Sequence, residues 1–451
     1  MRGMGRCLLA AIAAVGVVLM VGCAQAGTPN ALGGTQQVVI EGCDWGPAVT
    51  KAILCLDQEV DASTVRPGDF QVVETHEPSG VRTGGAHQEE SVPRMVADAY
   101  ACDAQGERTE AASSRYVALE LACGPELGSP FRYDFATSQV TWSDPYELRV
   151  SLLDGAGLRR PDGAQVRVLD IATDVDLDAA LIPQLEGVEL DESFTGTDGQ
   201  SLTYASFSPA EDGEEGGATH PLVIWLHGAG EGGTDPRIAV LGNKVSALLG
   251  REFQESMGGA YVLCPQTPLF WMVYDASGDW QDNPGTDSIY LATLKELIDK
   301  YVADHPGIDR SRIYVGGCSN GGYMTMDLLA NYPGYFAAGF PICEAYLDAG
   351  LDDVELAAVA QTPTWFTWAR NDTTVDPSRF EEPTVARLRA LGADVHTSVF
   401  DDVHDTSGLY AGPDGAPYQY QGHFSWVYFF DGLCEEDGVR LWDWLAAQRL
   451  G

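Results

Sequence analysis

The sequence predicts two domains of different fold class: an all-β sandwich, and a mostly parallel α/β sheet covered on both faces. Short apolar or alternating runs, separated by Gly, Pro, Asp and Ser clusters, fill residues 38–175. From residue 176 onward, buried-type runs alternate with helical patterns. The 451 residues are enough for two or three domains with substantial cores.

The first domain is predicted from short strand signals and from the lack of any long helical period. The strand signals lie at residues 37–40, 52–56, 70–73, 116–121 and 146–152. Several short strands at such spacing are typical of a β-sandwich. Residues 24–37, rich in Gly, Ala, Thr and Gln, are predicted to form a tether before it.

The second domain, residues 176–451, is predicted from alternating strands and helices. It opens with a hairpin signal at residues 194–204, where Asp198-Gly199 supplies the turn. Strands are expected at 222–226, 260–264, 312–316, 364–368 and 396–400, and helices at 291–302, 323–331 and 437–448. This alternation is typical of a doubly covered parallel sheet. We interpret the acidic stretch 211–217 as a loop between early strands.

Residues 1–23 are predicted to be an export signal. Arg2 and Arg6 precede an apolar run that ends at Met20-Val-Gly-Cys23. This ending resembles a bacterial lipoprotein processing site, so we expect lipid on Cys23 and a location on the outer face of a bacterial membrane. The alternative is ordinary cleavage near Ala24-Gln-Ala26, which gives a secreted protein.

The composition argues against nucleic-acid partners. The chain has 26 basic and 66 acidic residues, a net charge of −40, which repels nucleic acid and anionic lipid. Because the acids are spread along the chain, they indicate a solvated surface and not a binding tail. A lipid on Cys23 is therefore the one membrane contact that we expect.

The cysteines allow disulfides in an exported protein. Of the ten cysteines, eight remain when Cys7 and Cys23 are set aside. The candidate pairs are Cys43/Cys55, Cys102/Cys123 and Cys318/Cys343. No pair has zinc-ligand spacing with histidine.

A serine among glycines carries the main chemical signal. The stretch 315–324, VGGCSNGGYM, lies between a predicted strand and a predicted helix. Its centre matches G-x-S-x-G, which is weak alone but here has the strand–turn–helix context of a nucleophile elbow. Ser319 is therefore the predicted nucleophile, and the alternative is an ordinary glycine turn.

A nucleophilic serine needs a base, and the base needs an acid that fixes its tautomer. In proteins with such an elbow, the acid follows the serine and the histidine comes last. Asp372, just past the predicted strand 364–368, is chosen over Asp376, which is expected to start a turn before Pro377.

Three histidines follow Asp372. His396 alternates within a predicted strand, so we expect a structural role for it. His404 lies a few residues past the last strand, and spacing alone favours it as the base. His423 lies farther along the same long loop.

A glycine-rich loop follows the first buried strand. Residues 227–233, HGAGEGG, can expose backbone N–H groups. With the N–H of Asn320, those of Ala229 and Gly230 are predicted to form an oxyanion hole. A phosphate-cradling loop is the competing interpretation, but no Gly-Lys-Ser/Thr follows. His227 is expected to be structural.

Together these segments resemble secreted α/β-hydrolase esterases with an N-terminal immunoglobulin-like domain, grouped with prolyl-oligopeptidase-like hydrolases. The resemblance spans about residues 185–450, and DWGP at 44–47 extends it to the immunoglobulin-like domain. It rests on LHGAGE at 226–231, PQ at 265–266, IYVGGCSNGGY at 313–323, NDxxV at 371–375 and HxSW at 423–426.

The resemblance implies hydrolysis of a small-molecule carboxylic ester through an acyl-serine, with no metal or other cofactor. It implies His423 as the base, oriented by Asp372, which overrides the spacing preference for His404. The segment 405–421 departs from the family pattern, and we expect an insertion that covers the site; otherwise His404 returns as the base.

Residues near the elbow and the predicted strand ends are candidates for the substrate pocket, although a packing role is the favoured alternative for each. They are Trp271, Met272, Tyr323, Glu344 and Tyr346.

Two other functions remain open. A serine peptidase of the same mechanism is less favoured, because the sequence lacks the propeller domain of prolyl oligopeptidases. A catalytically inactive surface-binding lipoprotein is less favoured because all three motif groups are intact.

Overall fold

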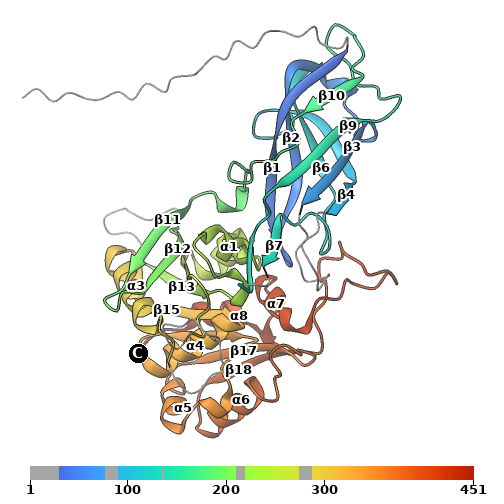
Figure 1. Cartoon of the computed structure of the whole chain (residues 1–451). Helices are drawn as coiled ribbons and strands as arrows, with labels where there is room; N and C mark the ends of the chain where they lie inside the picture. Colours follow the sequence, from blue (N-terminus) through green and yellow to red (C-terminus); the bar gives the residue numbers. More distant parts are fainter. Residues whose placement is uncertain (1–29, 77–89, 135–136, 210–218, 274–286) are drawn as a thin grey trace, which may run out of the picture.

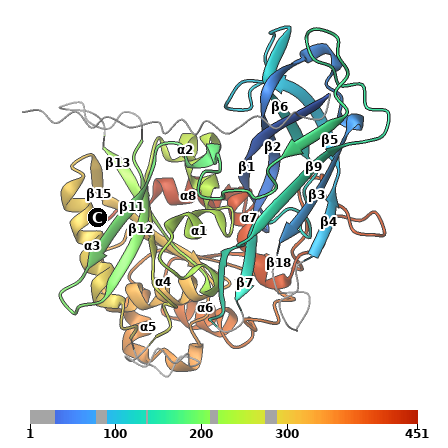
Figure 2. The same ribbon diagram turned by 45° about the horizontal axis from the view of Figure 1, so that its top comes forward.

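The structure is a computed structural model that describes residues 30–76, 90–134, 137–209, 219–273 and 287–451. The predicted export signal with Cys23 and the acidic stretch 211–217 lie outside these residues. A β-sandwich and an α/β domain make up the described part of the chain, and Figures 1 and 2 show the sandwich standing against one side of the α/β domain. The predicted division into two fold classes is confirmed.

The sandwich has one five-stranded and one three-stranded sheet. The larger sheet has the order β10 (Val168–Ile171), β1 (Ala31–Cys43), β2 (Gly46–Asp61), β6 (Ser113–Leu121), β5 (Val96–Cys102). The smaller has the order β4 (Glu90–Arg94), β3 (Phe70–His76), β9 (Tyr146–Leu152). Apolar residues that alternate along these strands form one core between the sheets. All five predicted strands fall within observed ones.

The predicted tether is wrong for residues 31–37, which belong to β1. Ala31 pairs with Val168, and Gly34 pairs with Leu56. A Cβ on Gly34 would lie 2.3 Å from the carbonyl oxygen of Cys55, so this glycine serves close strand approach and not linker flexibility.

The domain boundary lies later than the predicted residue 175/176. Leu181 still runs along β1, because its N–H donates to Val38 O and its carbonyl accepts from Ile40 N, both at 2.9 Å. A short turn, η3 (Pro183–Leu185), then leads to the first strand of the second domain at Val188.

The second domain is built on an eight-stranded sheet that is parallel from its third strand onward. Its order is β11 (Val188–Thr195), β12 (Ser201–Phe207), β14 (Tyr261–Gln266), β13 (His220–Leu226), β15 (Ile308–Cys318), β16 (Ala338–Ile342), β17 (Thr364–Ala369), β18 (Val395–Phe400). Every residue of β13, β14 and β17 is buried, as expected for strands covered on both faces.

Helices cover both faces of this sheet and create two apolar cores. The first core includes α1 (Pro236–Leu241), α2 (Arg251–Met257), α7 (Trp426–Phe430) and α8 (Leu441–Ala447). The second includes α3 (Leu291–Asp304), α4 (Asn320–Asn331), α5 (Asp353–Val359) and α6 (Glu381–Ala390).

The last predicted helix begins later than expected. Residues 437–440 belong to a small hairpin of β19 (Glu435–Glu436) and β20 (Val439–Arg440), and α8 starts at Leu441. Asp437 and Gly438 form its turn with φ of 52° and 78°. This Asp-Gly turn is a hairpin signal that the helical period concealed.

Two predicted cysteine pairs are wrong because strand register separates their members. Cys43 lies opposite Gly46 whereas Cys55 lies opposite Thr35, which places them roughly 30 Å apart along β2. Cys102 lies opposite Tyr116, roughly 20 Å from the position of Cys123 after β6. Cys318 and Cys343 follow neighbouring strands and are fully buried; like the other described cysteines, they are free thiols.

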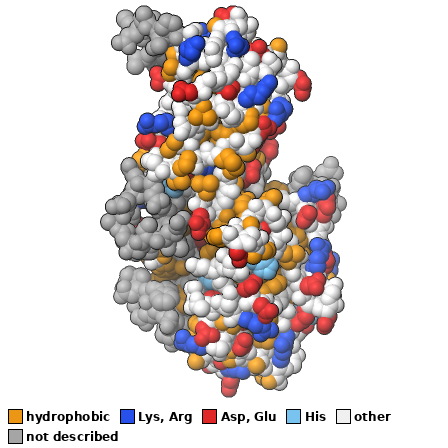
Figure 3. Space-filling model, turned by 90° about the vertical axis from the view of Figure 1, so that its right-hand side faces the viewer, with side chains coloured by type: hydrophobic (Ala, Val, Ile, Leu, Met, Phe, Trp, Pro, Cys, Tyr) orange, Lys and Arg blue, Asp and Glu red, His pale blue; other side chains and the backbone are white. Residues whose placement is uncertain are grey.

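The surface matches the expected dispersed charge. On the face in Figure 3, acidic side chains are scattered over both domains among Lys and Arg. Among the described residues, no helix is long and apolar enough to cross a membrane.

Candidate active site

Ser319 stands on a strained bend between β15 and α4. Its φ of 55° and ψ of −114° lie outside the ordinary regions for a non-glycine residue, and its N–H donates to Ile342 O at 2.9 Å. The strand–turn–helix context predicted from G-x-S-x-G is therefore present. Such strain at a strand-to-helix turn is typical of a nucleophile elbow.

The flanking glycines allow this bend because the chain passes against the end of β13. A Cβ on Gly317 would lie 2.3 Å from Leu226 O, and one on Gly321 would lie 1.9 Å from the same atom. Both glycines are required by close approach of backbones, because neither has a positive φ.

We expect Gly321→Ala to destabilise the second domain by about 3 kcal/mol, because the added methyl overlaps backbone that cannot move aside. The measurement is urea unfolding followed by tryptophan fluorescence. Gly68→Ala is the matched control, since a Cβ there meets no atom within 4 Å. Equal stability of the two variants would contradict the close-approach argument.

Asp372 and His423 are hydrogen bonded to each other. His423 Nδ1 lies 2.7 Å from Asp372 Oδ2, and both side chains are buried. The N–H groups of Thr374 and Val375 donate to Asp372 Oδ1 at 2.8 and 3.0 Å, which fixes the carboxylate. A carboxylate at Nδ1 holds the proton on that nitrogen and leaves Nε2 free to accept one.

The other candidates have different partners. His404 Nδ1 lies 2.7 Å from Asp402, and the side chains of this pair are about 40% exposed. Asp376 caps its own turn by accepting from Ser378. His396 stacks on Trp365 with ring centroids 4.9 Å apart. The structure therefore places His423, and not His404, on Asp372.

The ends of three neighbouring parallel strands bring these residues to one edge of the sheet. Ser319 follows β15, Cys343 follows β16 and Asp372 follows β17. Burial, and then the charges of Cys318 and Asp372, raise the pKa of the Cys343 thiol, which is also hydrogen bonded to the backbone of Ser319. Cys343 thus lies between the elbow and the acid, at the edge where ligands bind in open α/β sheets.

The glycine-rich loop lies beside the elbow because β13 is the other neighbour of β15. Ala229 and Gly230 lie in η4 (Ala229–Glu231), directly after this strand, and Asn320 is the first residue of α4. Trp271 ties the two segments together: its backbone N–H donates to Asn320 Oδ1 at 2.6 Å, and its indole donates to His227 O at 3.1 Å.

The proposed pocket residues lie in the protein interior. They are Trp271, Met272, Tyr323, Glu344 and Tyr346, each at most 3% exposed. The rings of Tyr323 and Tyr346 stack at 5.1 Å, and Glu344 accepts the N–H of Tyr346. In this structure they pack around the elbow, which is the alternative that the sequence left open. Burial raises the pKa of Glu344 to about 8.

His227 has the structural role expected for it. Its Nδ1 lies 2.6 Å from Gly228 O, and its Nε2 accepts the N–H of Thr267 at 3.1 Å. Burial lowers the pKa of His227 to about 4, so the ring is neutral in ordinary conditions.

Glu231, which the sequence reasoning missed, lies buried under the glycine-rich loop. Burial raises the pKa of Glu231 to about 7. Hydrogen bonds from the backbone of Glu231 and Gly228 and from the Asn243 side chain act in the opposite direction and lower it. A Cβ on Gly228 would lie 2.9 Å from its Oε2, so the side chain fills the space beneath the loop. An acid inside the HGAGEGG run was the one available signal.

The raised pKa of Glu231 predicts a pH-dependent stability. The folded protein keeps this proton until about pH 7, whereas the unfolded chain loses it near pH 4.5, so stability falls as pH rises between these values. Across this pH range the loss in the free energy of unfolding is about 3 kcal/mol. The free energy of unfolding, measured with urea from pH 4.5 to 8, should therefore fall less steeply with pH for Glu231→Gln than for the parent. The exposed Glu252→Gln is the control, and an unchanged slope for Glu231→Gln would contradict the assignment.

A hairpin of the sandwich touches the glycine-rich loop. It consists of β7 (Phe131–Asp134) and β8 (Gln139–Trp142), and Figures 1 and 2 show β7 reaching toward α1. Gln139 donates to Pro268 O at 2.9 Å, and Trp142 donates to Asp235 Oδ2 at 2.8 Å. Val140 Cγ1 lies 3.9 Å from where a Cβ on Gly230 would be.

We expect Gln139→Ala to lower kcat/KM roughly 2- to 10-fold, because it removes the hydrogen bond to Pro268 O. The neighbouring Thr267 O accepts the N–H of Gly233, so this segment supports the glycine-rich loop. Hydrolysis of a p-nitrophenyl ester measures the effect. Thr137→Ala, at an exposed position of the same hairpin, should leave it unchanged. Equal rates for both variants and the parent would show that the hairpin contact does not influence the loop.

Residues 405–421, here called the tyrosine loop, pack against the sandwich. The loop leaves and returns through a bridge between His404 and Gln419. The ring centroids of Tyr410 and Trp45 lie 4.7 Å apart, and the hydroxyl of Tyr420 lies 3.5 Å from Asp44 Oδ2. Figures 1 and 2 show this orange-red segment at the lower end of the sandwich. In its described contacts this segment joins the two domains, and the expected cover over the site stays a prediction.

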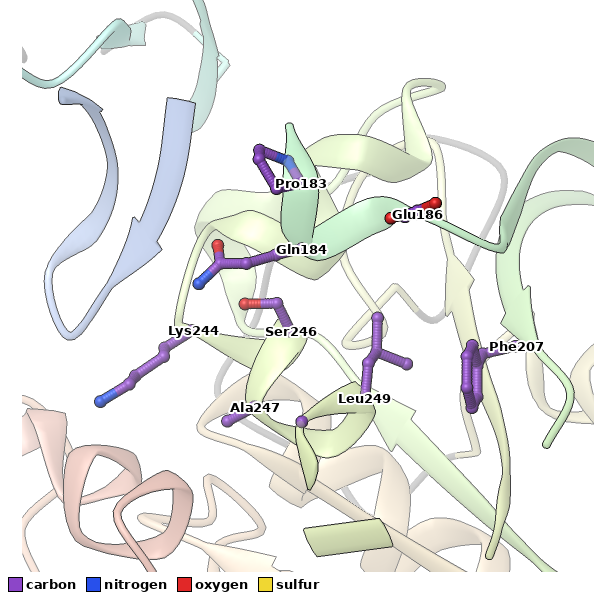
Figure 4. Close-up of a pocket in the computed structure, with 9 residues that line it drawn as sticks. Pro183, Gln184, Glu186, Phe207, Lys244, Ser246, Ala247 and Leu249 are labelled. Atoms are coloured by element: carbon purple, nitrogen blue, oxygen red, sulfur yellow. The ribbon is translucent and has the colours of Figure 1, made fainter. Parts of the chain in front are cut away.

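One surface hollow lies away from these residues. Figure 4 shows it between η3 and η5 (Val245–Leu249), with a volume of about 420 Å³. Pro183, Lys244 and Phe207 are among its lining residues, and Ser319, Asp372 and His423 are not. No group of three metal-ligating side chains is found in the part of the chain that the structure describes.

Comparison with known proteins supports both domains. Residues 35–164 match the family model of the esterase Ig-like N-terminal domain. The crystal structure of a thermostable esterase aligns with a TM-score of 0.68 over 92% of this chain and 99% of that chain, at 22% identity. The chain therefore has the fold of an α/β hydrolase preceded by an immunoglobulin-like domain of the esterase type.

Two further similarities are more limited. A segment of 50 residues, 11% of this chain, is 44% identical to poly(3-hydroxyalkanoate) depolymerase C of Paucimonas lemoignei, and it spans 12% of that protein. The acylaminoacyl peptidase of Pyrococcus horikoshii aligns with a TM-score of 0.39 and 15% identity, over 86% of this chain and 56% of that chain. The TM-score of 0.39 is too low to support any argument about this chain.

Proposed function

We propose that this chain is a serine esterase that hydrolyses carboxylic esters of small molecules. Ser319 is the nucleophile, His423 the general base, and Asp372 the group that orients His423. The observation that carries the proposal is the Asp372–His423 hydrogen bond at the same sheet edge as the strained Ser319 elbow. The immunoglobulin-like domain of the esterase type supports an ester substrate over a peptide.

The proposed reaction has two stages. Ser319 Oγ attacks the ester carbonyl while His423 Nε2 takes its proton, and the N–H groups of Ala229, Gly230 and Asn320 hold the oxyanion. The intermediate collapses, His423 returns the proton to the alcohol, and an acyl-serine remains. Water, activated by His423, then releases the acid. A single oxyanion donor of this kind contributes about 3 kcal/mol to the transition state.

The test is hydrolysis of p-nitrophenyl acyl esters, from acetate to long chains, by the protein without residues 1–23. A short 3-hydroxyacyl ester belongs in the set because of the depolymerase similarity. Turnover of esters with little or none of the matching amides supports the proposal. Faster cleavage of amides would favour the serine peptidase, and binding without turnover would favour the inactive binding protein.

We also propose that the protein is exported and carries lipid on Cys23, which follows the apolar run of the N-terminus. Growth with labelled palmitate should label the parent but not Cys23→Ser. An unlabelled parent, cut instead near Ala24-Gln-Ala26, would overturn lipid attachment while leaving export intact.

A further inference from the structure

Two half-buried cysteines meet at the end of the sandwich that faces the α/β domain. Cys43 is the last residue of β1, and Cys123 lies just past the end of β6. Both are free thiols in this structure. The ring centroid of Tyr410 lies 4.7 Å from that of Trp45, two residues after Cys43. The two thiols shift each other's pKa as hydrogen-bond partners, and the hydroxyl of Tyr410 also acts on the pKa of Cys123. A Cβ on the next residue, Gly124, would lie 3.9 Å from the Tyr410 ring, which places the tyrosine against this corner.

We propose that Cys43 and Cys123 form a disulfide bond in the mature, exported protein. Thiols already in hydrogen-bond contact need only small side-chain rotations to reach the S–S bond length of about 2.05 Å. An oxidising compartment, as expected from residues 1–23, allows the bond to persist. The proposal uses no residue of the proposed hydrolytic reaction and does not depend on it.

The positions of several other cysteines favour this pairing over the alternatives. Strand register separates Cys43 from Cys55 and Cys123 from Cys102. Cys318 and Cys343 are neighbours, but both are fully buried beside the Ser319 elbow, whereas Cys43 and Cys123 are half-buried. Among the described cysteines, Cys43 and Cys123 thus combine mutual contact with access from solvent.

The two thiols differ in pKa, so that one of them can supply the thiolate that starts disulfide exchange. The hydrogen bond with Cys43 lowers the pKa of Cys123 to about 7, and the same contact and burial raise the pKa of Cys43. Cys123 is therefore the thiol that supplies the first thiolate near neutral pH. Cys43 acts second, when the mixed disulfide has removed the negative charge beside it.

The oxidant is a disulfide, either oxidised glutathione or an exported thiol–disulfide oxidoreductase. The Cys123 thiolate attacks one of its sulfurs, which forms a mixed disulfide and releases one thiolate. Cys43, after losing its proton, attacks Cys123 Sγ and displaces the second thiolate. The two cysteine protons pass through solvent to the two leaving thiolates. One disulfide is thus reduced to two thiols while the Cys43–Cys123 bond forms.

The bond would join the two segments that receive the tyrosine loop. Asp44 and Trp45, next to Cys43, contact Tyr420 and Tyr410. On the other segment, Glu126 lies 3.4 Å from the hydroxyl of Tyr418. Because the loop ends two residues before His423, the disulfide fixes the surface on which the base-bearing segment is anchored.

Peptide mapping of the full chain tests the bond directly. The protein is isolated without reductant, denatured in iodoacetamide and digested with trypsin. Cys43 falls in the peptide that ends at Lys51, Cys55 in the one that begins at Ala52, Cys102 in the one that ends at Arg108, and Cys123 in the one that ends at Arg132. We expect a reducible link between the first and last of these. Alkylation of both Cys43 and Cys123, or a link from either to another cysteine, overturns the proposal.

A melting experiment separates a bond from mere proximity. Reduction of the parent should lower its melting temperature by roughly 5–10 °C. Cys43→Ser, Cys123→Ser and the double variant should all melt near the reduced parent and be insensitive to reductant. Cys55→Ser, a half-buried cysteine on β2, should behave as the parent. A single variant that still responds to reductant overturns the assignment.

Discussion

Replacement of Ser319 by alanine is expected to lower kcat for ester hydrolysis by a factor on the order of 10⁴–10⁶. The substitution removes the Oγ that becomes acylated and leaves the rest of the site in place. Asp372 keeps its hydrogen bonds to His423, Thr374 and Val375, because none of them involves Ser319. Residual turnover then reports what the oxyanion donors achieve with water as the nucleophile.

Steady-state hydrolysis of p-nitrophenyl acetate and labelling by a fluorophosphonate measure this effect. The parent should be labelled, with one label per chain, and Ser319→Ala should not. Ser378→Ala is the matched control, because this exposed serine only caps its own turn with Asp376. If Ser319→Ala keeps more than about a tenth of the parent rate, the acyl-serine mechanism is wrong.

The elbow was predictable because its chemistry is local. Gly317 and Gly321 are fixed by close approach to the end of the strand that the apolar run 222–226 predicted. The same holds for Asp372, whose carboxylate is bound by the N–H groups two and three residues later. Such signals survive in a sequence because the motif residues themselves lie within a few positions of one another, even though Leu226, which the glycines approach, belongs to another strand.

The predictions that failed depended on partners far along the chain. The glycines of residues 31–37 indicated a tether, but Gly34 needs a neighbouring strand, around Cys55, to explain it. The cysteine pairs were chosen by closeness in sequence, whereas antiparallel register carries Cys55 and Cys102 roughly 20–30 Å away from Cys43 and Cys123. No local pattern records the register of a sheet.

The contact between the domains was also beyond the sequence. Gln139 and Trp142 of the sandwich bind loops of the second domain some hundred residues later, at Pro268 and Asp235. Glu231 escaped notice because an acid in a glycine-rich loop is ordinarily solvated, and its burial follows only from the packing above it. These residues are found only when both domains are in place.

The choice between His404 and His423 shows how a long loop makes a prediction from sequence spacing fail. His404 stands the usual distance after the last strand, and His423 lies nineteen residues farther on. The bridge between His404 and Gln419 closes the tyrosine loop at its stem, so the chain returns almost to where it left. In space the loop therefore adds little distance, and the motif HxSW was the better guide to the acid's partner.

Replacement of His423 by alanine is expected to lower kcat on the order of 10⁴–10⁶, whereas His404→Ala should change it by less than about threefold. Both histidines have an aspartate at 2.7 Å, which makes them matched variants. Burial separates them: the side chains of His423 and Asp372 are 9% and 0% exposed, against 42% and 44% for His404 and Asp402. An exposed pair is screened by water and contributes about 0–1 kcal/mol to stability.

Only the buried pair can hold an imidazole in one tautomer and stabilise the imidazolium that forms when Ser319 attacks. Asp372→Asn should therefore reproduce most of the loss, on the order of 10⁴ in kcat, while Asp402→Asn should not. Initial rates on p-nitrophenyl esters, with melting temperatures to verify folding, decide the matter. A large loss in His404→Ala with a folded, active His423→Ala would move the base to His404, and with it the orienting acid to Asp402.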